Sequence, residues 1–183
     1  EQFRPGVMER FHADYARLTS LNPRLIYCSF SGYGQTGPLK DLPGHDITFE
    51  AHAGILGVMA DRGGRPVIPG VPIADLASGF NAAFAILAAL RTRDRTGRGE
   101  FVDVSIFDTA VALMVLNLAH LIAAQEEPAA GETILTGRFP FYDLYETADG
   151  YQLTAEIPGV ASDDIRISLE GSTVILEGER KID

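Results

Sequence analysis

Residues 75–93 read DLASGFNAAFAILAALRTR, and the segment TGRG at 96–99 and the apolar run FVDVS at 101–105 follow them. Phe80, Ala83, Phe84 and Leu87 share one stripe, because they recur at the three-to-four-residue spacing of one helix face. The arginines near the end of the run suit the negative end of a helix dipole. The pattern therefore predicts a long helix over 75–93, a stop at 96–99 and a strand over 101–105.

On both sides of this segment, strand and helix patterns alternate. An apolar run at 25–30 predicts a strand, and the glycine-rich sequence SGYGQTGP at 31–38 follows as a loop that suits either a ligand or a tight turn. Further helices are predicted over residues 7–18, 46–58 and 108–124, the last of them buried. This alternation predicts an α/β layer fold.

Composition narrows the classes of partner. The formal charge is −10, from 15 basic and 25 acidic residues. We expect neither nucleic acid nor a membrane as a partner, because both are bound mainly through clusters of Lys and Arg. Cys28 is the only cysteine, which excludes an internal disulfide and favours a reducing, cytoplasmic compartment. The chain starts at Glu1 with no signal sequence, and its longest apolar stretch, 109–124, is shorter than a bilayer span, so we expect a fragment of a non-membrane protein.

The pattern changes after about residue 142. Apolar and polar residues alternate over 151–157, 165–169 and 173–177, with Pro-Gly and Gly-Ser pairs between the runs. This predicts a short antiparallel β meander of three strands with one solvated face. We therefore expect two domains, residues 1–150 and 151–183.

His45 and Asp75 are the candidate chemical groups. Each has an ordinary alternative, since Asp75 at a helix start suits an N-cap and His45 suits a turn that precedes a helix capped by Asp46. Taken separately, neither residue indicates a reaction, and no metal site is expected.

A series of motifs along residues 1–150 gives these two residues a context. In order they are FRPG (3–6), NPRLIY (22–27), SGYGQTGP (31–38), GHD (44–46), IADL (73–76), RTGRG (95–99) and VDVS (102–105). Together they resemble family III of the CoA transferases, which includes the α-methylacyl-CoA racemases. The resemblance implies a partial Rossmann-like domain that takes a coenzyme A thioester as substrate and forms a homo-oligomer, an interlocked dimer in the family.

The resemblance implies two alternative chemistries for Asp75. In the transferases the matching carboxylate attacks the acyl-CoA thioester and forms a mixed anhydride, which requires an ionised nucleophile. In the racemases the matching Asp and the His of GHD remove and return the α-proton on opposite faces. An imidazole suits that task because its ordinary pKa is about 6.5, whereas an Asp needs burial to raise its pKa. Both alternatives stay open, and Asp46 is expected to orient the imidazole.

The resemblance also implies contacts with coenzyme A. Matching positions line the CoA site or pass its pantetheine arm, and arginine suits phosphate because its donors form a rigid fork. The expected binding residues are Gln2, Phe3, Arg4, Arg10, Pro43 and Gly44. The resemblance also implies that the family's opening strand-turn-helix units, which complete this site, would precede Glu1, so we expect part of the CoA site to be missing from residues 1–183.

Two features depart from the family. The racemases carry a further catalytic Glu beyond the motif YETADG (145–150), whereas this chain has Gly159 at that spacing and Glu156 nearby but out of register. Residues 143–183 also resemble the first strands of the α-crystallin domain of small heat-shock proteins. That second resemblance implies an alternative function, a chaperone or oligomerising module in the tail.

Overall fold

The computed structural model describes residues 1–61, 64–133, 135–139, 144–147, 150–153, 165–170 and 173–178. The chain divides into two compact units, residues 1–133 and 134–183, and each is described by itself.

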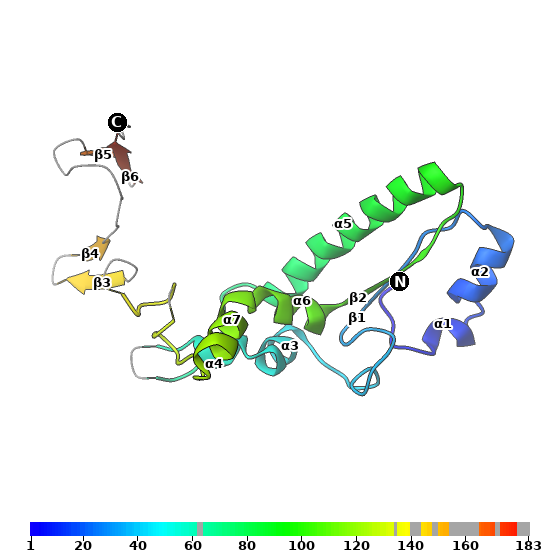
Figure 1. Cartoon of the computed structure of the whole chain (residues 1–183), viewed down its shortest axis with the longest axis horizontal. Helices are drawn as coiled ribbons and strands as arrows, with labels where there is room; N and C mark the ends of the chain where they lie inside the picture. The colour runs from blue at the N-terminus through cyan, green and yellow to red at the C-terminus, as the bar shows by residue number, and fades with distance from the viewer. Residues whose placement is uncertain are drawn as a thin grey trace. The chain divides into compact units, whose positions relative to one another are not determined.

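The first unit is built on a parallel pair of strands. β1 (Tyr27–Ser31) lies beside β2 (Phe101–Ser105), with Tyr27 opposite Phe101 and Ser31 opposite Ser105. Three helices lie between these strands in the chain: α3 (Asp46–Ala53), α4 (Ile55–Val58) and α5 (Ile73–Thr96). Figure 1 shows α5 running alongside the two strands. The mixed helix and strand prediction is confirmed, while the Rossmann-like sheet stays a prediction because the described strands of this unit form only one parallel pair.

The helix predicted over 75–93 is confirmed as α5, with two more residues at its start and three at its end. Gly97 ends it with φ of 77°, a left-handed conformation that glycine adopts at little cost. The strand predicted over 101–105 is confirmed as β2. The strand predicted over 25–30 begins two residues later, at Tyr27.

Three predicted helices are each broken in two. Residues 7–18 form α1 (Val7–Arg10) and the start of α2 (Tyr15–Leu21), because the Asp14 carboxylate accepts a hydrogen bond from Arg17 N (3.0 Å) and starts a new helix. Residues 46–58 break at Gly54, whose φ of 88° lies outside the helical region. Residues 108–124 form α6 (Ile106–Leu113) and α7 (Val115–Ala124), with a 59° bend between them.

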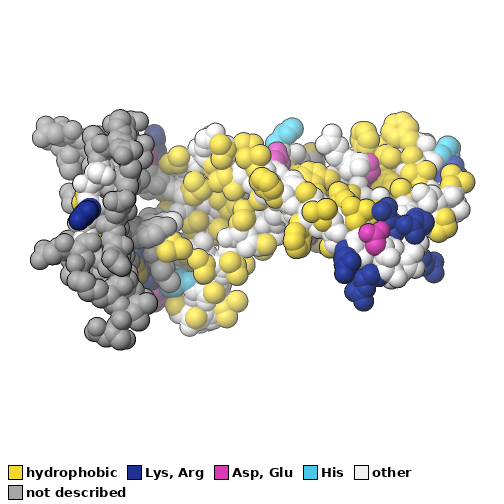
Figure 2. Space-filling model, turned by 90° about the horizontal axis from the view of Figure 1, so that it is seen from above, with side chains coloured by type: hydrophobic (Ala, Val, Ile, Leu, Met, Phe, Trp, Pro, Cys, Tyr) yellow, Lys and Arg dark blue, Asp and Glu magenta, His cyan; other side chains and the backbone are white. Residues whose placement is uncertain are grey.

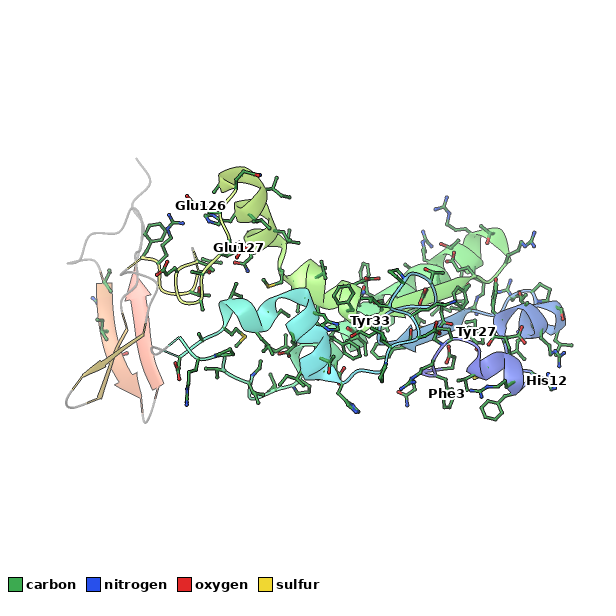
Figure 3. The ribbon with its side chains drawn as sticks, turned by 90° about the horizontal axis from the view of Figure 1, so that it is seen from below. Phe3, His12, Tyr27, Tyr33, Glu126 and Glu127 are labelled. Carbon is green, nitrogen blue, oxygen red and sulfur yellow. The ribbon has the colours of Figure 1, made fainter. Side chains whose placement is uncertain are left out.

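The core lies between the start of α5, α3 and α6. Tyr33, in the loop after β1, contacts Phe49 of α3 edge-on (ring centroids 5.1 Å apart) and Phe107 of α6 (5.6 Å). Figure 3 labels Tyr33 beside these two helices, on the side of the strands. The buried cluster consists of Tyr33, Phe49, Ile55, Ala74, Ile106, Ala110 and Met114. The start of α5 is thus fixed by the core.

The rest of α5 and α7 have uncovered apolar faces. On α5, Phe80 is 79% exposed and Phe84 75%, and on α7 no residue is buried. The prediction of a buried helix over 108–124 is therefore wrong for α7, because hydrophobicity does not determine whether a neighbour covers a helix. Figure 2 shows many hydrophobic side chains over the part of this unit that faces the viewer. By length and composition alone, α5 would also be able to cross a membrane, although core helices of soluble proteins pass the same test.

The second unit contains two antiparallel strand pairs. β3 (Leu144–Thr147) pairs with β4 (Gly150–Leu153), and β5 (Ile165–Glu170) pairs with β6 (Thr173–Gly178). The single three-strand meander is therefore not found in the described residues. The first predicted strand pairs instead with residues 144–147, which had been assigned to the preceding domain. The boundary expected near Gly150 therefore falls inside a strand pair, since Gly150 lies opposite Thr147.

Candidate functional site

The first turn of α5 places Asp75. Pro72 occupies the N-cap position and has no side-chain acceptor for the free N–H groups of the turn. Two carboxylates from α3 supply acceptors instead: Glu50 Oε1 accepts from Ile73 N (3.1 Å) and Asp46 Oδ1 accepts from Asp75 N (2.9 Å). The backbone of Asp75 is thus held by a neighbouring helix.

His45 lies directly before α3, at its N-cap position. Its carbonyl accepts from Thr48 N (2.7 Å), and its own N–H donates to Thr48 Oγ1 (3.5 Å). The preceding Gly44 lies against the ring of Phe49, since a Cβ at that position would come within 2.5 Å of it. Only a glycine fits there without moving the buried ring, so Phe49 and Gly44 together fix where His45 enters α3.

His45 and Asp75 line one open cavity of about 580 Å³, and both side chains are exposed in it. Its wall is about equally polar and apolar, and it includes seven of the nine residues that the sequence singled out. The lining consists of Gln2, Phe3, Arg4, Phe30, Ser31, Gly32, Leu42, Pro43, Gly44, His45, Phe49, Asp75 and Ile106. Figure 3 shows Phe3 near α1, at the opposite end of the strands from α3 and α6.

Asp46 and Arg10 do not line this cavity. Asp46 was expected to orient the imidazole of His45, but its Oδ1 accepts a hydrogen bond from Asp75 N instead (2.9 Å). Arg10 ends α1 and also lies outside a second cavity, of about 580 Å³, that Arg4 shares. Arg4 and Lys40 are the bases of that second cavity, and they face four acidic side chains: Glu1, Glu9, Asp14 and Asp41.

Charges in the first cavity act on Asp75. Partial loss of solvent around the Asp75 carboxyl raises its pKa, the neighbouring Asp46 carboxyl raises it further, and His45 opposes the shift. The two candidate groups therefore interact electrostatically, and Asp75 holds a proton more tightly than an ordinary aspartate.

Sequence reasoning missed Glu50. Its side chain is completely buried, at 0% exposure, and burial followed by the Asp46 carboxyl raises its pKa. The only signal in the sequence was the spacing of Asp46 and Glu50, four residues apart and therefore on one face of a predicted helix. An acidic residue at that spacing is more often solvent-exposed.

The chain is similar to known proteins over most of its length. A profile of CoA-transferase family III matches residues 1–159. Mouse succinyl-CoA:glutarate CoA-transferase is 36% identical over 82% of this chain and 34% of that protein. Human alpha-methylacyl-CoA racemase is 36% identical over 90% of this chain and 47% of that protein. A crystal structure of a CAIB/BAIF family protein from Brucella suis superposes with a TM-score of 0.75 and 30% identity, over 85% of this chain and 41% of that one.

The matched relatives are longer than this chain. It spans between about a third and a half of the length of each of these relatives. The family profile continues to residue 159, past the boundary expected near Gly150. The comparisons give no support to a small heat-shock segment in residues 143–183. The positions of Glu156 and Gly159, where a third carboxylate was sought, lie outside the described residues.

Proposed function

The chain belongs to CoA-transferase family III, and from this membership we propose that it binds an acyl-CoA and acts on the acyl group through Asp75 and His45. The observation that carries the proposal is that these two side chains, from separate segments of the chain, line one cavity. The apolar half of the lining, which includes Phe30, Phe49 and Ile106, suits the acyl chain of a thioester.

We propose α-proton transfer as the reaction. One of the two groups takes the α-proton of the thioester, electrons move onto the thioester oxygen as an enolate, and the other group returns a proton on the opposite face. The raised pKa of Asp75 supports this role, because a carboxyl that must both release and donate a proton works best when its pKa lies near the operating pH.

Transfer of coenzyme A is the second candidate. Here the Asp75 carboxylate attacks the thioester carbonyl, the C–S bond breaks, CoA leaves as a thiolate and an acyl anhydride remains on Asp75. The position of Asp75 in the first turn of a 24-residue helix favours this role, since the helix dipole stabilises a carboxylate there. Similarity to a mouse protein named succinyl-CoA:glutarate CoA-transferase supports it as well.

Coenzyme A is proposed to lie along the residues that line the cavity next to the reacting pair. Pro43 and Gly44 form one wall, and Gln2, Phe3 and Arg4 form another. Arg4 is the proposed phosphate contact, because its guanidinium is the basic group of this lining. Arg10 has no support from the geometry of either cavity.

Self-association is proposed as well. Large exposed apolar patches on soluble proteins mark interaction surfaces, and α5 and α7 present such faces in the first unit. A second copy of the chain would remove these faces from water, in agreement with the homo-oligomer implied by the sequence.

The test compares α-proton exchange of a 2-methylacyl-CoA in D₂O, followed by NMR, in the wild type and three variants. His45→Ala and Asp75→Ala should each slow exchange by about 10²- to 10⁴-fold, whereas His120→Ala in α7, outside the cavity, should change nothing. Absence of α-proton exchange in the wild type, together with an acyl adduct on Asp75 by mass spectrometry, would favour CoA transfer, because that reaction moves no α-proton. No heat of binding with any acyl-CoA by titration calorimetry would refute both reactions.

A further inference from the structure

We infer that Glu50 is a positioning residue that carries a proton: its carboxylic acid caps the first turn of α5 and donates its proton to Asp46, which in turn holds Asp75. The inference rests on the proposed function only for the importance of Asp75. The proton itself is measurable without any catalytic activity.

Two hydrogen bonds join α3 to the start of α5. Glu50 lies on α3, and its Oε1 accepts from Ile73 N at the start of α5 (3.1 Å). One helical turn earlier, Asp46 Oδ1 accepts from Asp75 N (2.9 Å). Pro72 has no side-chain oxygen with which to cap this turn. The two carboxyl groups therefore act together as the N-cap of α5, from a different helix.

The other carboxyl oxygen of Glu50, Oε2, has a different environment from Oε1. Among the described residues, Oε2 is buried and no donor gives it a hydrogen bond. An ionised carboxylate with an unpaired oxygen in a protein interior loses its hydration without compensation. A protonated oxygen needs only one acceptor, and Asp46 lies four residues away on the same face of α3.

The charged groups near Glu50 determine whether an ionised carboxylate would be balanced there. On its own helix the charged neighbour is Asp46, and from α5 the facing groups are the backbone N–H groups of Ile73 and Ala74, which lower the pKa of Glu50 by less than burial and Asp46 raise it. α4 has no titratable residue, and the only one on α6, Asp108, lines a separate cavity beside Tyr33. The two ion pairs among the described residues, Arg65–Asp61 and Arg93–Asp94, do not include Glu50.

No cation in this group therefore balances the charge of Glu50, and a proton is the remaining way to do so. Burial, followed by the Asp46 carboxyl, raises the pKa of Glu50, which agrees with this conclusion. The consequence reaches the site through Asp46. With the Glu50 proton on one side and Asp75 N–H on the other, the Asp46 carboxyl is held in place, where it raises the pKa of Asp75.

The test is a pH titration of the carboxyl carbons by NMR in the whole chain labelled with ¹³C-Glu and ¹³C-Asp. Glu50 should titrate well above the ordinary value of about 4.3 for glutamate. Glu50→Gln keeps the acceptor for Ile73 N and provides an amide donor for Asp46, so it should leave the titration of Asp75 and the exchange protection of the Ile73 and Asp75 amides unchanged. Glu126→Gln, after α7, is the matched control.

Glu50→Ala removes both contacts. The Ile73 and Asp75 amides should then exchange about tenfold faster or more, and rescue by Glu50→Gln separates a hydrogen-bonding role from a charge. A Glu50 resonance that titrates at the ordinary value would overturn the inference. So would equal amide protection and equal Asp75 titration in all three proteins. Should Glu50→Ala not fold, the wild-type titration and Glu50→Gln still decide the question. Neither carboxyl titration nor amide exchange depends on catalysis, so a failure of the proposed reaction is distinguishable from a failure of this inference.

Discussion

In the first two turns of α5, Ala74 and Ser78 are completely buried, whereas Phe80 and Phe84 further along the same helix are 79% and 75% exposed. The small and polar side chains lie inside, and the large apolar ones lie outside. In this helix, a side chain is therefore buried where another segment packs against it, whether or not the side chain is strongly hydrophobic.

The reason is the difference in what each part of the helix needs. The N–H groups of a first turn have no partners inside the helix, so they must find acceptors, and here Asp46 and Glu50 of α3 supply them. The middle of α5 already satisfies its backbone internally, so only its side chains gain from a neighbour. Asp75 therefore lies in the turn of α5 whose backbone N–H groups need acceptors from another helix.

The largest expected effect compares two phenylalanines. Phe49, 3% exposed beside the first turn of α5, should cost about 3–5 kcal/mol of unfolding free energy when changed to Ala, because a large buried ring is lost. Phe84→Ala, at an exposed position, should stay within about 0.5 kcal/mol. Urea unfolding followed by circular dichroism measures both. Similar losses in the two variants would mean that the middle of α5 is covered in solution.

A second pair tests the same contrast with alanines. Ala74 lies in the buried cluster, so Ala74→Leu should overpack it and cost about 1–3 kcal/mol. Ala83→Leu, at an exposed position on the same helix, should change stability little. The difference between their unfolding midpoints gives the measurement. A neutral Ala74→Leu would show that the first turn is loosely packed.

The extent of α5 and of β2 could be predicted because local signals mark them. A helical stripe, arginines at the helix end and Gly97 as a stop lie within one continuous segment, and no distant contact is needed to interpret them. The placing of His45 and Asp75 in one cavity could be anticipated only from the motifs, since each residue alone suits a cap or a turn.

The breaks and the burial could not be predicted. Gly54 is compatible with a helix interior in the sequence, and nothing local marks the bend at Met114 between α6 and α7. Burial of Glu50 depends on the docking of α5, which lies far along the chain. The exposure of α7 likewise depends on which segment or copy covers it, and the hydrophobic pattern of one chain carries no such information.

A smaller effect is expected on the pH dependence of stability. The raised pKa of Glu50 means that the folded chain binds this proton more tightly than the unfolded chain, so stability falls as pH rises from about 4.3 through the raised pKa. Glu50→Gln should remove that part of the slope, which for one proton is at most about 1.4 kcal/mol per pH unit. The raised pKa of Asp75 contributes with the same sign in both proteins, so their difference in urea midpoint against pH isolates Glu50. Parallel curves would contradict the expectation.

The smallest expected effect on folding is at the exposed face itself. Phe84→Glu places a charge on the uncovered stripe of α5, where it stays solvated, so the unfolding free energy of the isolated chain should change by no more than about 0.5 kcal/mol. Its effect on association should be much larger, because a charge buried between two copies would lack a partner. Sedimentation velocity should show a shift toward monomer, with the conservative Phe84→Leu retaining the larger species. If both variants sediment as the wild type does, the face is not an interface between copies, and the exposed middle of α5 differs from its buried start for a reason other than assembly.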